Sequence, residues 1–173
     1  MRTTTFSLAI MLLTTRLAHA DADASEPTFT IATDPIALAY ETYTLSLARR
    51  ASSHVALRAD VEYTPDSIAP LGSPHGGARV AASVPIYLDR TFHGPYVEPG
   101  VFLARHRALA VDGLGGIGYS EPYELTGTSM AVGWQATFRS GFTIHAAIGA
   151  DRIRSGGLVT TMPTSYLRVG YAW

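Results

Sequence analysis

Cysteine and lysine are both absent from this sequence of 173 residues, and its 13 cationic residues are all arginines. Without cysteine the chain has no disulfide framework, no thiolate metal site and no cysteine nucleophile. Charged residues make up 16% of the chain, well below the share of about 25% that is usual in soluble domains. With a net charge of −1, the chain lacks the basic excess of nucleic-acid-binding proteins, so we expect no nucleic-acid partner.

The sequence also lacks an apolar run of about 20 residues, the length that a transmembrane helix needs. Near the N-terminus, a basic residue precedes the short apolar segment Phe6–Leu13, and the small residues Ala18 and Ala20 follow it. This order is typical of a secretory signal peptide. We therefore expect residues 1–20 to be a signal peptide and residues 21–173 to form one exported domain.

Apolar residues alternate with polar or small residues along much of the chain, which is the period of a β-strand. In residues 54–63, for example, Leu57 and Val61 lie on one face, whereas Arg58 and Glu62 lie on the other. Four further segments show the same separation: 79–89, 129–138, 142–151 and 166–173. Less regular alternation predicts three more strands, at 28–38, 42–49 and 96–105.

The first predicted strand changes phase within residues 28–38. Its apolar residues switch from odd positions, ending at Ile31, to even positions, beginning at Ile36. A bulge or bend near Asp34 and Pro35 is needed to restore one continuous apolar face.

The eight predicted strands are joined by connections that alternate in length. Short connections cover residues 49–53, 89–94 and 139–141, whereas long connections cover residues 65–77, 106–125 and 152–163. An even number of antiparallel strands, with short turns at one end and long loops at the other, is typical of bacterial outer-membrane barrels. The sequence therefore predicts an all-β fold, an eight-stranded antiparallel up-and-down transmembrane β-barrel.

Alternation alone does not say which face of the barrel is outside. The less apolar face is rich in small residues, which suit the crowded interior of an eight-stranded barrel: Ala56, Ala81, Ala131, Gly133, Ala147, Gly149, Gly170 and Ala172. The apolar face carries no charge along the five regular segments, as contact with lipid requires. We therefore place the apolar face against lipid. A secreted, lipocalin-like barrel that binds a small ligand stays open as an alternative.

The end of the chain has apolar residues at alternate positions, Leu167, Val169, Tyr171 and Trp173. This pattern resembles the C-terminal assembly signal of Gram-negative outer-membrane proteins, which implies that the Bam assembly machinery recognises these residues. The whole pattern resembles the small barrels of the OmpA, OmpX and OmpW type, and residues 29–63 are similar to a barrel domain family of unknown function. The resemblance implies a location in the outer membrane of a Gram-negative cell, and we expect a monomer.

Polar and charged residues alternate with the small ones on the predicted inner face: Arg58, Asp60, Glu62, Arg79, Glu98, Gln135, His145, Asp151 and Arg168. Charges in a narrow interior persist when they are paired and hydrogen-bonded. We interpret this set as a polar network that fills the lumen and fixes strand register. A narrow path for ions or solutes is the alternative, since eight strands leave no wide pore.

Four arginines mark the long-loop ends of predicted strands: Arg105, Arg107, Arg152 and Arg154. Guanidinium groups match phosphate geometry well, so one hypothesis is contact with lipopolysaccharide and other outer-membrane lipids. The alternative is that these side chains are ordinary solvated charges that extend toward water.

No catalytic motif stands out. The histidines are scattered, and neither a His-x-Ser pair nor a Gly-x-Ser-x-Gly elbow is present. We therefore expect a protein that is not an enzyme and that needs no cofactor or metal. A lipid A-modifying enzyme stays open as an alternative, with His106 beside Asp112 or Asp151 as its possible acid-base pair.

Overall fold

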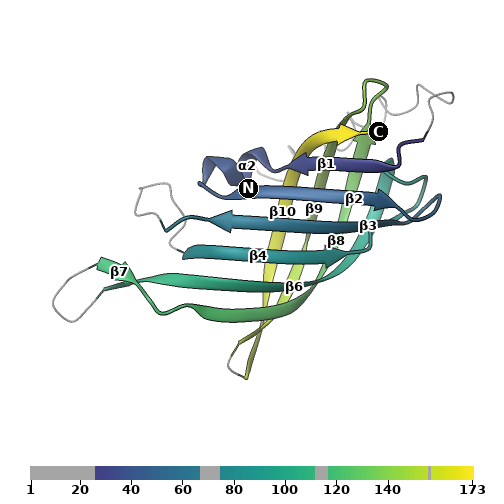
Figure 1. The fold of residues 1–173 in the computed structure, drawn as a ribbon. Coiled ribbons are helices and arrows are strands. Elements are labelled where there is room, and N and C mark those ends of the chain that lie inside the picture. The colour runs from purple at the N-terminus through teal and green to yellow at the C-terminus, as the bar shows by residue number, and fades with distance from the viewer. Residues whose placement is uncertain (1–25, 67–74, 112–116, 156) are drawn as a thin grey trace, which may run out of the picture.

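A computed structural model describes residues 26–66, 75–111, 117–155 and 157–173 (Figure 1). The expected signal peptide, residues 1–20, lies outside the described residues. Within the described part of the chain, no helix is long and apolar enough to cross a membrane. The elements follow in the order β1 (Phe29–Thr33), α2 (Pro35–Ala39), β2 (Tyr43–Arg50), β3 (Ala56–Thr64), β4 (His75–Ser83), β5 (Ile86–Tyr87), β6 (Gly94–Val111), β7 (Ile117–Tyr119), β8 (Tyr123–Thr137), β9 (Phe142–Ser155) and β10 (Leu158–Ala172).

The main strands form one closed antiparallel sheet. Hydrogen-bonded neighbours run in the order β4, β3, β2, β1, β10, β9, β8, β6, and pairing between β4 and β6 closes the ring. β5 continues the line of β4 against β6, while β7 pairs with the far end of β6. Figure 1 shows β1 to β4 as one wall, with β8 to β10 crossing behind it at a steep angle. The predicted eight-stranded antiparallel barrel is confirmed.

The two ends of the barrel differ. At the short-turn end, residues 51–55, 88–93 and 138–141 connect strands, and β1 begins beside the end of β10. The opposite, long-connection end holds α2. The strands that extend farthest toward the long-connection end are β6, β8, β9 and β10, with 18, 15, 14 and 15 residues.

The predicted long loops at residues 106–125 and 152–163 are therefore wrong in large part. β6 and β8 remain paired as far as His106 opposite Tyr123, and β9 and β10 remain paired as far as Ser155 opposite Leu158. Alternation of hydropathy fades in these extensions because charged side chains, such as Arg107, Arg152 and Arg154, take outward positions there, although the backbone ladder continues. The hydropathy pattern depends on the surroundings of the side chains, whereas the hydrogen bonds between strands depend on the backbone alone.

The phase change in residues 28–38 is resolved by a helix rather than by a bulge within one strand. β1 ends at Thr33, and the Asp34 side chain caps α2 by accepting hydrogen bonds from the backbone N–H groups of Ile36 and Ala37, at 2.8 and 3.1 Å. Pro35 occupies the first turn, where a missing N–H costs nothing. The other carboxylate oxygen of Asp34 accepts from the Leu167 N–H of β10 at 3.2 Å, so Asp34 supplies the acceptor that β1 no longer provides.

The predicted strand over residues 79–89 is interrupted as well. β4 ends at Ser83, and pairing with β6 resumes at Ile86 and Tyr87 after Pro85. Proline has no N–H to donate to a ladder. Its position explains why a continuous alternation in sequence becomes two strands.

Large apolar side chains cover the outside of the barrel, whereas small and polar side chains lie inside. Leu57, Val132 and Ile148 point outward and keep 56%, 51% and 67% of their surface exposed. On the inner face, a Cβ atom added to Gly133 would lie 2.7 Å from the ring of Tyr96. Glycine at this position makes room for an inward-pointing tyrosine.

We expect Val132→Arg to destabilise the barrel in lipid by about 2 to 4 kcal/mol, because the charge would face the apolar part of the membrane. Thr126→Arg is a matched control on the same outward face of β8, opposite Arg154 and beyond the apolar residues. We expect this control to cost less than about 1 kcal/mol. Urea unfolding of vesicle-inserted protein, followed by gel mobility of unboiled samples, measures both. Equal losses would contradict the assignment of the lipid-facing face.

Candidate functional site in the lumen

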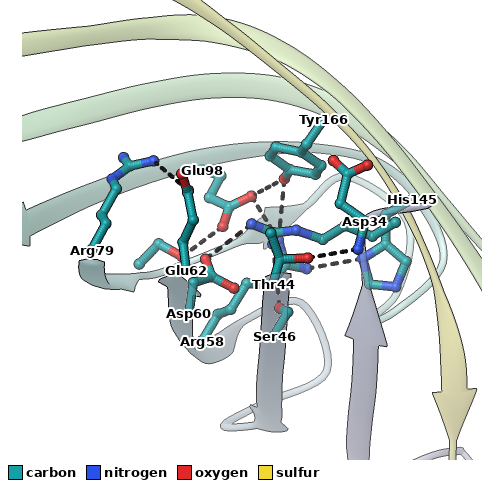
Figure 2. Close-up of polar contacts among 12 residues, drawn as sticks. Asp34, Thr44, Ser46, Arg58, Asp60, Glu62, Arg79, Glu98, His145 and Tyr166 are labelled. Atoms are coloured by element: carbon teal, nitrogen blue, oxygen red, sulfur yellow. Dashed lines mark hydrogen bonds and ion pairs between the residues drawn. The ribbon is translucent and has the colours of Figure 1, made fainter. Parts of the chain in front are cut away.

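An ion pair lies at the centre of the barrel interior. The Arg58 guanidinium donates to Glu98 at 2.7 Å, and the two side chains are 0% and 6% exposed. The same guanidinium lies 3.2 Å from the hydroxyl of Tyr166 and 3.3 Å from Nδ1 of His145. Figure 2 shows these side chains converging inside the barrel. Four strands, β3, β6, β9 and β10, therefore meet at one arginine.

The Glu98 carboxylate is held by more than the arginine. Ser83 donates to it at 2.5 Å, and the Tyr166 hydroxyl also donates to it. The hydroxyls of Tyr96 and Tyr166 lie 2.8 Å apart. A buried carboxylate with this many donors can stay charged. Among the described residues, Nε of Arg58 and Nε2 of His145 are buried without a hydrogen-bond partner.

Two further arginines form ion pairs between this centre and the long-connection end. Arg168 contacts Asp60 at 3.1 Å and stacks over the Tyr166 ring at 4.0 Å. Arg79 contacts Asp151 at 2.9 Å, with Glu62 at 4.0 Å. Each arginine joins strands that lie far apart in the sequence, so the pairs brace opposite walls of the barrel.

The short-turn side of the centre is filled by buried aromatic rings. The ring centroid of Tyr87 lies 6.1 Å from that of Phe92 and 5.2 Å from that of Tyr96. The Tyr87 hydroxyl donates to Gln135 at 2.6 Å, and the Gln135 amide donates to Thr143 at 3.1 Å. This layer combines apolar packing with satisfied polar groups and occupies the lumen.

A cavity of about 70 Å³ lies among the charged residues on the long-connection side of the centre. One carboxylate oxygen each of Asp60 and Asp151 is buried without a hydrogen-bond partner among the described residues, and both residues line the cavity. Buried polar atoms of this kind are normally satisfied by water, which takes about 30 Å³ per molecule. The cavity therefore has room for water beside these oxygens.

All nine residues predicted to form a lumen network lie on the inner face. The structure groups Arg58, Glu98 and His145 at the centre, pairs Arg168 with Asp60, and pairs Arg79 with Asp151 and Glu62. Gln135 belongs to the aromatic layer instead. Sequence reasoning missed the inward-pointing partners of these groups: Ser46, Ser83, Tyr87, Tyr96 and Tyr166. Alternation along the strands indicates that these side chains point inward, but tyrosine and serine carry no charge that marks them as partners of the ion pairs.

The alternative acid-base pair is not assembled among the described residues. The ring of His106 packs 6.5 Å from that of Tyr123, and Asp151 is engaged by Arg79. Asp112 lies outside the described residues.

The four alternating C-terminal residues lie along β10 beside β1. Trp173 exchanges backbone hydrogen bonds with Phe29, at 2.9 and 3.0 Å. The Trp173 ring also stacks on the rings of Phe29 and Tyr171, with centroids 6.0 and 6.3 Å apart. The last residues therefore form part of the seam that closes the barrel.

Comparison with known proteins identifies the fold. No family model matches the chain, and no curated protein matches its sequence. A solved structure, the N-terminal β-barrel domain of Pseudomonas aeruginosa OprF, superposes with a TM-score of 0.55 at 14% sequence identity. The match covers 87% of this chain and 100% of that domain. The chain therefore shares the closed, eight-stranded barrel fold of that domain. At 14% identity the likeness concerns architecture alone.

The central ion pair generates a prediction. We expect Arg58→Met and Glu98→Gln each to destabilise the barrel by about 3 to 5 kcal/mol, because each leaves a buried charge without its partner. The double variant buries neither charge and keeps one acceptor oxygen for the hydroxyls of Ser83 and Tyr166, so its stability should return toward that of the parent. Urea unfolding of the three variants measures the coupling. Additive losses in the double variant would contradict a mutually dependent pair.

Proposed function

We propose that this protein is an outer-membrane barrel, monomeric and not an enzyme, with a structural and surface-contact role and a lumen filled by side chains. The observation that carries the proposal is the distribution of side chains across the wall. A closed barrel with uncharged, exposed apolar residues outside and paired charges inside is the inverse of a water-soluble barrel. This distribution favours a membrane location over the secreted, ligand-binding alternative.

The height of the apolar wall supports a membrane location. Along β9 the outward residues are apolar from Phe142 to Ala150 and become basic at Arg152. The eight residue steps from Phe142 to Ala150, at about 3.3 Å each with a tilt of about 40°, correspond to about 20 Å, and Arg152 follows at about 25 Å. The first charge on this face therefore lies at the edge of an apolar band of about 25 Å, the height typical of outer-membrane barrels.

Aromatic side chains border this wall at both ends. Phe29, Tyr171 and Trp173 lie together at the short-turn end. On the other side, Tyr43 of β2 lies opposite Tyr63 of β3, and both are more than half exposed. Rings of this kind favour the interface between lipid and water, so the two groups support the same placement.

The filled lumen favours a structural role over a pore. Arg58, Gln135 and His145 are almost wholly buried, and the aromatic layer lies beside them. Eight strands enclose a space that side chains can fill. A role in transport would need the central network to rearrange.

A fractionation experiment tests the proposed location and role. We expect the protein to remain with the outer membrane and, unboiled, to migrate faster on a gel than after boiling. In planar bilayers we expect no stable conductance steps, and lipid A mass spectra should be unchanged on overexpression. Recovery in the soluble fraction without a mobility shift would overturn the membrane location. Stable conductance would overturn the closed lumen, and an altered acyl pattern would overturn the non-enzymatic role.

We further propose that the Bam machinery recognises the C-terminal residues, as the resemblance to the assembly signal implies. Deleting Trp173 should lower the amount of folded protein in the outer membrane several-fold, whereas Trp173→Phe, which keeps an aromatic ring, should have little effect. Because Trp173 also contacts Phe29, both variants should be refolded in detergent without any machinery. A deletion that fails equally in detergent would indicate a defect of barrel closure instead of recognition.

A further inference from the structure

The structure separates the four outward arginines into two pairs with different surroundings. On β6, Arg107 forms an ion pair with Asp66 at 2.9 Å, and Arg105 lies opposite Glu124 of β8. On β9, Arg152 and Arg154 are exposed. Neither has a carboxylate within ion-pair distance in the part of the chain that the structure describes. The positive charge of the β9 pair is therefore left for an external group.

Threonine hydroxyls flank the β9 pair on both sides. Arg152 lies opposite Thr128 of β8 and Thr161 of β10, and Arg154 lies opposite Thr126 of β8. The two arginines and the two β8 threonines line one depression in the outer wall, together with Val101 and Gly127. Guanidinium groups bind phosphate in a forked geometry, and hydroxyls add donors and acceptors. This arrangement suits a phosphate carried on a hydroxyl-rich group.

A second depression lies lower on the same wall, toward the short-turn end. It is lined by Val132 of β8, Ile148 of β9, and Pro163 and Ser165 of β10. Between the two depressions, β9 presents only the small side chain of Ala150 on its outward face, opposite Met130 and Pro163. Basic and hydroxyl groups above an apolar groove match a molecule with a phosphorylated head and an acyl chain.

We propose that the outer wall of β8, β9 and β10 binds a phosphorylated glycolipid of the outer leaflet. Arg152 and Arg154 hold a phosphate, the threonines contact the neighbouring sugar, and an acyl chain lies over Ala150 toward Ile148. The pair is two residues apart on one strand, about 7 Å, which lets both guanidinium groups reach one phosphate. The inference rests on the proposed membrane location, because the long-connection end of an outer-membrane barrel faces the outer leaflet.

A glycolipid is favoured over a glycerophospholipid by the chemistry of the upper depression. Three threonines, Thr126, Thr128 and Thr161, surround the arginine pair, and a sugar ring offers several hydroxyls for them to contact. A phosphate diester with a small head group would leave most of these hydroxyls to water. The site therefore discriminates by the polar group beside the phosphate.

Binding to folded protein in detergent micelles tests the site. The probes are diphosphoryl lipid A, the same lipid without phosphates, and phosphatidylglycerol, measured by native mass spectrometry. The variant is Arg152→Gln with Arg154→Gln, and the matched control is Arg105→Gln with Arg107→Gln, which removes the same charge. Heat-dependent gel mobility checks that every variant is folded.

We expect the β9 double variant to weaken binding of diphosphoryl lipid A at least tenfold and the β6 double variant to change it less than threefold. Removing the phosphates from the lipid should weaken binding to the parent protein to a similar extent. Equal losses in the two double variants would show general charge attraction and overturn the site. Equal binding of phosphatidylglycerol, with the same dependence on Arg152 and Arg154, would overturn the choice of a glycolipid. Failure of the folded parent protein to bind diphosphoryl lipid A would overturn the site but not the membrane location, which fractionation tests separately.

Discussion

Closure of the sheet between β1 and β10 is the constraint on which the other features of this barrel depend. Register pairs from Thr30 and Ala172 to Thr33 and Val169 join the two strands, and the backbone exchange between Phe29 and Trp173 extends the seam at the short-turn end. In lipid, an unpaired strand edge would leave N–H and C=O groups without partners, each at a cost of several kcal/mol. A short β1 therefore needs Asp34, whose carboxylate both caps α2 and accepts from the next backbone donor of β10.

The seam also explains Pro163. The backbone N–H and C=O of Trp173 face β1, and so do those of the other odd-numbered residues of β10. Pro163 is odd-numbered, so its backbone nitrogen faces the same side of β10, at a point where β1 has already ended. A proline at such an edge removes a donor that would otherwise invite another strand.

Closure in turn creates the interior that the charged residues occupy. Eight strands leave space for side chains only, and a charge placed there is stable only with a partner. The structure meets this requirement in layers, with aromatic rings near the short turns, the Arg58 and Glu98 pair at the centre, and the Arg168 and Arg79 pairs beyond it. Because each pair joins distant strands, the lumen network also favours one strand register over its neighbours. A one-residue slip would turn every inward charge onto the apolar outer face.

The outer wall carries the part of the molecule that is free to interact. Its polar margin is uneven, because β6, β8, β9 and β10 extend beyond the other strands. On these extensions Arg105 and Arg107 have acidic neighbours, whereas Arg152 and Arg154 lie opposite threonines. The segments that the sequence suggested as loops are thus paired strands, which set the spacing of these side chains, as a binding site requires.

Sequence alone determined the strands of the apolar band and the face on which each side chain lies, because side chains alternate along any strand whatever its partner. Arg58, Asp60 and Glu62 were readable as inward, and Leu57 and Val61 as outward, from parity alone. Tertiary structure decided which of the inward residues meet, how far the strands continue, and where α2 and the break at Pro85 interrupt them. These features depend on register and stagger between strands that are distant in sequence, and backbone pairing leaves no trace in hydropathy where the outward side chains are polar. The partnership of Arg58 with Glu98, 40 residues apart, and the isolation of Arg152 and Arg154 are consequences of that stagger.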